Sequence, residues 1–237
     1  MKKNVLHAYE HLSSHYEFDV DRKPYNAYLE RPAMVNLLPE LQGRKVLDAG
    51  CAAGWYARYM ADYGADVTAI DLSPSMIAAT QRRAGNAKIC AFVHDLVDPL
   101  PINDESLDFI ISSLTLHYIK EWEPIFQEFH RTLKPGGTLL FSTHHPIMDY
   151  MNHKVKNYYA CQQMQEEWTV DGEKVPMTFY RRPLEEIISA VTDRFHFIQL
   201  SEPKPTPEFK DVHPDGFHKV STKPNFMIVK AKKPGPI

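Results

Sequence analysis

The sequence predicts an α/β protein whose mostly parallel sheet is doubly wound, with helices on both faces. Between residues 44 and 143, short apolar segments typical of buried strands alternate with segments that have the apolar spacing of helices. A glycine-bearing turn follows the first strand segment, and an aspartate follows each of the next two. Strands connected in this way run parallel through right-handed crossovers, and ligands bind at their carboxyl ends, where the winding reverses.

Five strands and three helices are expected within this alternating region. The strands cover residues 45–48, 66–70, 89–93, 107–111 and 138–143. The first helix covers 55–63 and stops at Gly64, a typical C-terminal cap. The second begins after Ser73, whose side chain can cap it, and ends near Gly85. The third covers 124–133, and a turn over 134–137 leads into the fifth strand.

The remainder of the chain has a different pattern. Residues 144–182 are rich in His, Tyr, Met and Trp and lack clear periodicity, so we expect an insertion over the ligand edge of the sheet. A helix over 184–191, a strand over 195–200, a proline-rich loop over 201–224 and a last strand over 225–231 follow. We therefore expect a single domain over 1–237, divided into an N-terminal helical cap (1–43), a ligand-binding core (44–143), the insertion (144–182) and the final helix and strands (183–237).

The composition is that of a globular protein. Of 237 residues, 43% are hydrophobic and 24% are charged, which allows a sizeable core and excludes a disordered or collagen-like chain. The net charge of -3 gives no strongly basic footprint, so nucleic acid is not the expected partner.

Cys51, Cys90 and Cys161 are too widely spaced for a disulfide framework or a structural zinc site, and no metal is expected. With neither a signal-peptide pattern nor an apolar run of about 18 residues, we expect no membrane association and a cytoplasmic protein.

The turn after the first strand reads Asp48-Ala49-Gly50-Cys51-Ala52-Ala53-Gly54. Such a turn between a strand and a helix lets the backbone approach a ligand closely. The dinucleotide-binding motif requires a third glycine where this chain has Trp55, and that glycine allows the helix to pack close to the strand. An NAD-dependent oxidoreductase is therefore not favoured.

The turn resembles the acidic-x-Gly-x-Gly-x-Gly motif of class I S-adenosylmethionine (SAM) dependent methyltransferases, of the small-molecule, UbiE/BioC-like type. Asp48, Gly50 and Gly54 match this motif, whereas Ala52 replaces its middle glycine. Further matches are Asp71, Asp95 and the Leu133-Lys134-Pro135-Gly136-Gly137 segment, so that the resemblance covers about residues 44–145. It implies a Rossmann-like, seven-stranded sheet with an antiparallel last strand, SAM as the cofactor and S-adenosylhomocysteine (SAH) as the product.

The resemblance also assigns roles to individual residues of the cofactor site. Asp71 is expected to accept hydrogen bonds from the ribose hydroxyls, and the alternative is a helix-capping or solvated aspartate. Asp95 corresponds to the residue that accepts the adenine amino group, and Leu72 and Met76 either sandwich the adenine or belong to the core. Tyr9, Tyr16 and Tyr25 are alternatives for an N-terminal residue that folds over the cofactor. The complete predicted set is Asp48, Gly50, Cys51, Ala52, Gly54, Asp71, Leu72, Met76, Asp95, Leu96 and Ser113.

The acceptor site is less clearly marked. Methyl transfer is an in-line displacement that depends on positioning, and a general base is needed only where the nucleophile loses a proton. His117, just after the fourth strand, is the candidate for a substrate-lining residue and for such a base. The other predicted substrate-binding residues are His144, His145, Tyr150 and Trp168.

Aromatic residues of the insertion either enclose a planar or apolar substrate or pack the insertion onto the sheet; besides Tyr150 and Trp168 they are Tyr158, Tyr159, Phe179 and Tyr180. Arg181 and Arg182 either pair with an anionic substrate group or are solvated.

The sequence favours a methyltransferase that acts on a small molecule, as a monomer or homodimer. Residues 112–115 read Ser-Ser-Leu-Thr, which lacks the Asp/Asn-Pro-Pro-aromatic motif of enzymes that methylate DNA amino groups. Two alternatives stay open at this point: an RNA or protein methyltransferase, and a non-catalytic SAM-binding protein on the same fold.

Overall fold

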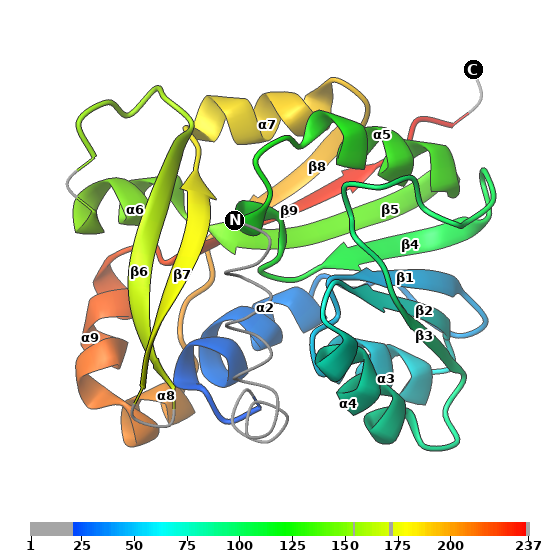
Figure 1. Ribbon diagram of the computed structural model, residues 1–237, viewed down its shortest axis with the longest axis horizontal. Helices are drawn as coiled ribbons and strands as arrows, with labels where there is room; N and C mark the ends of the chain where they lie inside the picture. The colour runs from blue at the N-terminus through cyan, green and yellow to red at the C-terminus, as the bar shows by residue number, and fades with distance from the viewer. Residues whose placement is uncertain (1–20, 154, 171–172, 236–237) are drawn as a thin grey trace.

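A seven-stranded sheet forms the centre of the computed structural model, which describes residues 21–153, 155–170 and 173–235. The strand order is β3-β2-β1-β4-β5-β9-β8 (Figure 1). The bounds are β1 Lys45–Ala49, β2 Asp66–Asp71, β3 Ile89–Val93, β4 Leu107–Ser112, β5 Leu133–His144, β8 His196–Ser201 and β9 Phe226–Lys232.

The first five strands run parallel, and β9 is antiparallel to both of its neighbours, β5 and β8. This arrangement confirms the predicted fold class, including the antiparallel last strand. The order reverses between β1 and β4, which is where a doubly wound sheet leaves a crevice at its carboxyl edge.

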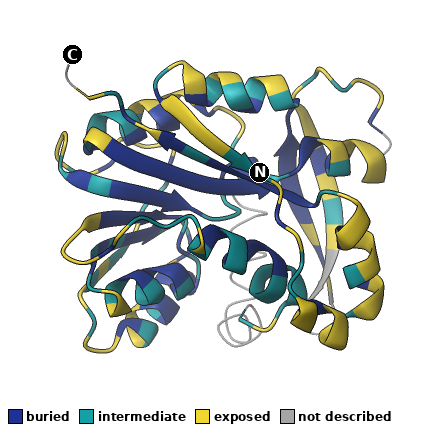
Figure 2. Cartoon of the chain, turned by 180° about the vertical axis from the view of Figure 1, so that it is seen from behind, coloured by how far each residue is buried: buried dark blue, intermediate teal, exposed yellow. Residues whose placement is uncertain are grey.

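Helices cover both faces of the sheet (Figure 1). Alternate strand residues point to opposite faces, so the central strands contribute to two cores. Leu47 of β1 packs in the core that includes α5 and α7, and its neighbour Val46 packs in the core that includes α2 and α3. The bounds of these helices, with α4, are α2 Arg31–Val35, α3 Trp55–Asp62, α4 Pro74–Ala84, α5 Glu123–Thr132 and α7 Leu184–Thr192. Figure 2 shows the central strands as almost continuously buried.

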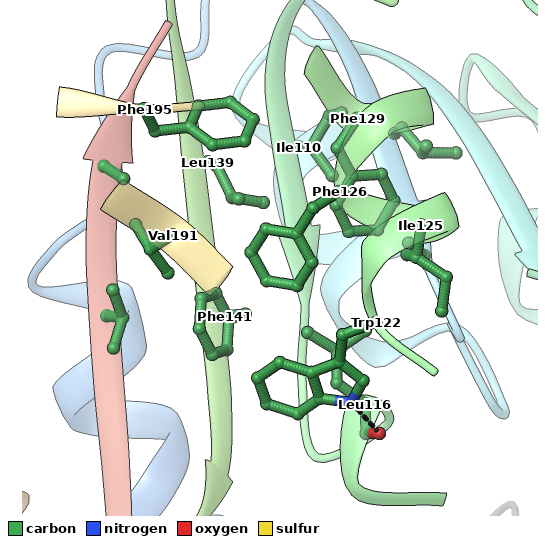
Figure 3. Packing of buried hydrophobic residues seen from close by; sticks show 14 of the residues in the cluster. Ile110, Leu116, Trp122, Ile125, Phe126, Phe129, Leu139, Phe141, Val191 and Phe195 are labelled. Carbon is green, nitrogen blue, oxygen red and sulfur yellow. Dashed lines mark hydrogen bonds between the residues drawn. The ribbon is translucent and has the colours of Figure 1, made fainter. Parts of the chain in front are cut away.

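The core beneath α5 also positions part of the site (Figure 3). Trp122 stacks on Phe126, and Phe126 meets Phe141 of β5 edge to face at 5.7 Å. The indole nitrogen of Trp122 donates to the carbonyl oxygen of Leu116 at 2.8 Å. Leu116 begins the short helical turn η2 (Leu116–Tyr118), so this bond ties the turn that carries His117 to the hydrophobic core.

Capping residues in the sequence correctly predicted where the core helices α3 and α4 begin or end. Ser73 caps α4 by accepting a hydrogen bond from the backbone N–H of Met76, and Pro74 is the first helical residue. Gly64 follows α3 with φ +86°, a left-handed conformation that suits glycine.

After residue 143 the structure contains helices and strands that the sequence did not predict, and the prediction of a loop over 201–224 was wrong. The insertion contains a helix, α6 (Pro146–Asn152), and a separate antiparallel hairpin of β6 (Gln162–Val170) and β7 (Glu173–Arg181). The expected loop over 201–224 contains α8 (Pro207–Val212) and α9 (Pro214–Thr222). Both helices begin with proline, which fits the first turn because its missing N–H needs no partner there.

The turn expected over 134–137 is part of β5, which already begins at Leu133. Leu133 pairs with Leu107, and the register then shifts before Thr138 pairs with Phe109. Gly136 has φ +76°, so the backbone bends there as the glycine predicted, but pairing continues on both sides of the bend.

The described part of the N-terminal region contains a π-helical turn, η1 (Asn26–Glu30), which continues into α2. The turn η1 packs against α8. Figure 1 shows α2 beside the carboxyl edge of the sheet. Tyr9 and Tyr16 lie outside the described residues.

Candidate active site

A cavity of about 710 Å³ lies at the carboxyl edge of the parallel strands. One end lies between the loops that follow β1, β2 and β3, and the other lies between η2, the end of β5 and the start of β9. The N-terminal segment 23–26 and Arg31 also line it. The cavity therefore occupies the crevice that the sheet order predicts, and it joins two chemically different ends.

The loop after β1 approaches the cavity through its backbone. Gly50 has φ +84°, and a Cβ atom there would lie 2.3 Å from the side chain of Thr115. Ala52 also has a positive φ of 46°, at the position where the family motif carries glycine. The N–H of Ala52 donates to Asp71 Oδ2 at 2.9 Å, and its carbonyl accepts from the Thr80 hydroxyl at 2.8 Å. These bonds hold the alanine in a conformation that it rarely adopts.

Two predicted cofactor residues do not reach the cavity. Gly54 has φ +76° directly before α3, and a Cβ there would lie 2.7 Å from Thr80 Cγ2, so its role is to let α3 and α4 approach closely. Met76 is fully buried and is not among the residues that line the cavity. Of the two apolar candidates for the adenine, only Leu72 lies at the cavity wall.

Asp71 lies at the end of β2, at the cavity wall. Its two carboxylate oxygens accept from the N–H groups of Ala52 and Ser73, each at 2.9 Å. Burial raises its pKa, and those backbone donors act in the opposite direction. Because each carboxylate oxygen has a second lone pair, the group can also accept from ligand hydroxyls.

Asp48 is almost fully buried at the end of β1 and lines the same cavity. Its Oδ2 atom has no hydrogen-bond partner. Burial raises its pKa from 3.8 to about 7, and the negative charges of Asp71 and Glu30 add to the increase. A buried acceptor without a partner, beside two other carboxyl groups, favours a cationic ligand.

Glu30 and Arg31 belong to the site although the sequence did not predict either of them. Glu30 is fully buried and accepts from three hydroxyl groups, those of Tyr56 (2.7 Å), Ser113 (2.8 Å) and Ser142 (2.6 Å). Burial raises its pKa despite these donors. This network fixes η1 against α3 and the ends of β4 and β5.

Arg31 lines the cavity with its guanidinium 4.5 Å from the Trp55 ring, and it pairs with Asp21 at 3.1 Å. The only signal in the sequence was a Glu-Arg pair within the segment Tyr-Leu-Glu-Arg-Pro-Ala-Met-Val, which reads equally well as a solvated pair.

The loop after β3 also lines the end of the cavity that is formed by the loops after β1, β2 and β3. Asp95 and Leu96 line the cavity together with His94, as the sequence predicted for the first two. Asp95 Oδ1 accepts from the N–H of Val97 at 3.1 Å, which orients its carboxylate.

Two histidine rings stack at the other end of the cavity. His117 of η2 and His144 of β5 have ring centroids 4.0 Å apart and an interplanar angle of 18°. Phe179 of β7 packs edge-on against both rings. Neither ring nitrogen of His117 has a hydrogen-bond partner, and burial, with the nearby His144 and Arg182, lowers its pKa well below the usual value.

The other predicted substrate residues lie elsewhere. His145 is buried outside the cavity lining, where its Nδ1 accepts from the N–H of Ile147 to cap α6 and its Nε2 lies 2.9 Å from Glu202. Tyr150 is half exposed and packs on Tyr158. Neither side chain lines this cavity. Trp168 lies in β6, paired with Val175, and its side chain is outside the described part of the chain.

The Tyr and Phe side chains of the insertion that the structure describes do not line the cavity. The Arg181 guanidinium lies over the Tyr158 ring at 4.6 Å, and the Tyr158 hydroxyl accepts from the N–H of Leu184 at 3.1 Å. Arg182 is buried, lies over the Trp122 ring at 4.5 Å and donates to the carbonyl of Ile119. Both arginines are therefore used in packing, and neither prediction for them, substrate pairing or solvation, was right.

Comparison with known proteins agrees with this geometry. Residues 47–141 match the family model of the methyltransferase domain. The chain is 28% identical to an uncharacterized protein of Haemophilus influenzae over 88% of each chain. It is 31% identical to a malonyl-[acyl-carrier protein] O-methyltransferase of Enterobacter lignolyticus, over 60% of this chain and 54% of that protein.

Solved structures of SAM-dependent methyltransferases are also similar to this chain. A putative SAM-dependent methyltransferase from Listeria monocytogenes superimposes with a TM-score of 0.77 at 26% identity, over 86% of this chain and 96% of that one. A SAM-dependent methyltransferase from Mesorhizobium loti gives 0.70 at 25% identity, over 90% and 100%. The fold and the cavity define a SAM-dependent methyltransferase, an enzyme with SAM as its cofactor. Within that class, the chain is similar to the class I methyltransferases of the UbiE/BioC-like type, chiefly over residues 47–141.

The residues that the structure describes contain neither a candidate membrane span nor a candidate metal site. None of their helices is both long and apolar enough to cross a membrane. Within the same residues, no group of three His, Cys, Asp or Glu side chains is arranged to hold a metal ion.

Proposed function

We propose that this methyltransferase transfers the methyl group of SAM to a small-molecule acceptor bound between the stacked histidines and the cofactor. The observation that carries the proposal is the continuous cavity at the carboxyl edge of the sheet, which has carboxylates and loop backbone at one end and mostly apolar and aromatic walls at the other. A concave site of this size suits a small ligand beside the cofactor better than a polymer segment.

The lining fits SAM on its own chemistry. The unpartnered Oδ2 of Asp48 is a buried acceptor for the cationic end, and Arg31 is a donor for the methionine carboxylate. Asp71 would accept from the ribose hydroxyls, and Asp95 would accept from the adenine amino group beside Leu96. The other predicted residues at this wall are Gly50, Cys51, Ala52, Leu72 and Ser113.

SAM supplies an electrophilic methyl group on a sulfonium centre when it is bound. The chain contributes orientation, because Asp71 and the loop after β1 would fix the cofactor while η2 and β5 hold the acceptor wall. Alignment of this kind can lower the barrier by about 7–11 kcal/mol in favourable cases. The apolar walls would also limit the water around the bound ligands, which strengthens the electrostatic contribution of Asp48.

The malonyl-[acyl-carrier protein] O-methyltransferases suggest a second candidate, an acceptor presented on a carrier protein. This chain spans about half the length of the one compared above, so the similarity supports the shared cofactor chemistry more than a shared acceptor. A non-catalytic SAM-binding protein would have the same cofactor residues and would differ only in turnover.

Calorimetry with SAM, SAH and NAD tests the cofactor assignment. We expect binding of SAM and SAH and none of NAD, and binding of NAD alone would contradict it. A screen for SAH release against a panel of metabolites then tests the acceptor class. Turnover only with RNA or a protein in that screen would contradict a small-molecule acceptor.

A further inference from the structure

The end of β5 and the start of α6 bring a histidine and a buried carboxylate together beside the cavity. His144 lines the cavity, and its Nδ1 lies 3.5 Å from Oδ1 of Asp149. Asp149 is 2% exposed, and neither of these two atoms has a hydrogen-bond partner. The separation is long for a hydrogen bond, but such contacts commonly shorten when substrate binds.

This contact distinguishes the two ring nitrogens of His144. A carboxylate facing Nδ1 favours the tautomer that carries its proton there, which leaves Nε2 as the proton acceptor. The same carboxylate would stabilise the imidazolium that forms when Nε2 takes up a proton. His144 thus has the two attributes of a general base, an accessible position at the cavity and a group that orients it.

His117 lacks these attributes although it lies against the same ring. Both of its nitrogens are buried without a partner, and its lowered pKa keeps it neutral. It stacks on His144, and Phe179 packs edge-on against it from β7. His117 is therefore a positioning residue, and the structure moves the candidate base from His117 to His144.

The walls around the histidines indicate which acceptors fit. Apolar and aromatic side chains dominate this end, among them Leu114, Tyr118, Ile119 and Phe226. The carboxylates Asp48, Asp71 and Asp95 belong to the cofactor end. Glu121 also lines the cavity, but it is exposed and its carboxylate is paired with Lys120 at 2.9 Å. A cationic amine that moved from water into this end of the cavity would meet no unpaired carboxylate in the lining, so the free-energy cost of removing its charge from water would not be offset.

We propose that the acceptor is an uncharged aromatic or enolic hydroxyl compound, and that His144, oriented by Asp149, removes its hydroxyl proton during methyl transfer. This inference rests on the proposed function. The acceptor oxygen forms a bond to the methyl carbon, and the carbon–sulfur bond breaks with its electron pair retained by sulfur, which becomes a neutral thioether. The hydroxyl proton passes to Nε2 of His144 and later to solvent, so the products are a methyl ether, SAH and a proton.

The test uses 4-nitrophenol, whose phenolate form absorbs visible light and reports its own protonation. The probe is added to the protein saturated with SAH, so that no methyl transfer occurs. An apolar site alone would favour the neutral phenol, whereas a base at His144 should raise the phenolate fraction of bound probe at least about twofold over free probe at the same pH. With SAM in place of SAH, the same probe should be converted to 4-nitroanisole.

Variants connect this signal to the two residues. His144→Gln should bind SAH and abolish the rise in phenolate absorption, and Asp149→Asn should reduce it. His196→Gln, an exposed change on β8, is the matched control and should behave as the wild type. If His144→Gln fails to bind SAH because it misfolds, Asp149→Asn alone decides the question.

Each other outcome overturns a stated part of the proposal. Bound probe that stays a neutral phenol in the wild type, or a signal unaffected by both variants, removes His144 as the base. Binding of the cation 4-nitrobenzylammonium in place of 4-nitrophenol overturns the acceptor class. Failure to bind SAH at all contradicts the proposed function itself, so the two failures can be distinguished.

Discussion

The two ends of the cavity are built in different ways. The cofactor end comes from consecutive strand–loop units, in which Gly50, Ala52 and Asp71 are placed by short connections directly after β1 and β2. The acceptor end is assembled from segments far apart in the chain, which are η2, the end of β5 and the start of β9. The first end depends on backbone geometry and the second on packing between side chains. Substitutions at the two ends should therefore affect different measurable properties.

The largest effect on stability is expected behind the acceptor end. Phe179→Ala removes a fully buried ring that packs on His117 and His144, and it should lower the free energy of unfolding by about 4 kcal/mol. Urea denaturation measures this loss. Tyr159→Ala, at a residue that is 79% exposed, is the control and should change stability by less than about 0.5 kcal/mol. A mild effect of Phe179→Ala would mean that the hairpin is not needed to hold the histidine pair.

The largest effect on cofactor affinity is expected at Asp71. Asp71→Ala removes the acceptor for both ribose hydroxyls and the support of the Ala52 N–H. We expect a loss of about 3 kcal/mol in binding, equal to roughly 100-fold in Kd for SAH. Calorimetry measures it, with the exposed Asp193→Ala as control. An unchanged Kd would mean that the ribose does not bind at Asp71, and it would contradict the assignment of the cofactor end of the cavity.

A pH effect should separate Asp48 from the acceptor end. Its pKa is about 7 in the folded chain and 3.8 ordinarily, so the folded chain keeps a proton that the unfolded chain has released between these values. This carboxyl therefore lowers the free energy of unfolding as the pH rises from about 4 to about 7, and the effect levels off above that range.

A cationic ligand favours the ionised form of Asp48. SAM affinity should consequently rise with pH below about 7, by up to about tenfold per pH unit, and level off above it. Calorimetry of SAM binding across this range measures the slope. Asp48→Asn should flatten it, and a slope that survives in this variant would assign the titration to another group, such as Asp71 or Glu30.

The smallest effect concerns the backbone of the cofactor loop. Ala52→Gly should relieve a positive φ and stabilise the protein by about 0.5 kcal/mol, because the strain removed slightly exceeds the backbone entropy gained by the unfolded chain. Ala53→Gly, whose φ is not positive, should destabilise it by about 1 kcal/mol. Urea denaturation compares the two. Equal effects would mean that Ala52 is unstrained.

Local patterns accounted for the sheet and for most of the cofactor end. Gly50 and Asp71 could be placed because a strand followed by a tight turn leaves few backbone geometries, and the required residue types show in the sequence. The helices α8 and α9 were missed because their prolines, taken as signs of a loop, occupy first-turn positions where proline is tolerated. Met76 and Gly54 were assigned to the site although they support it from behind, since burial is not visible in a motif.

The sequence by itself determined the alternation of strands and helices and the edge of the sheet that binds a ligand, because both follow from short-range periodicity and turn chemistry. The class of cofactor was implied by the resemblance of the loop after the first strand to a family motif. Only the tertiary structure decided that Arg31 and Glu30 reach the site, that His144 rather than His145 lines the cavity, and that Arg181 and Arg182 are used in packing. These outcomes depend on contacts between residues tens of positions apart. Such contacts are selected by the packing of the whole chain, and no local pattern encodes them.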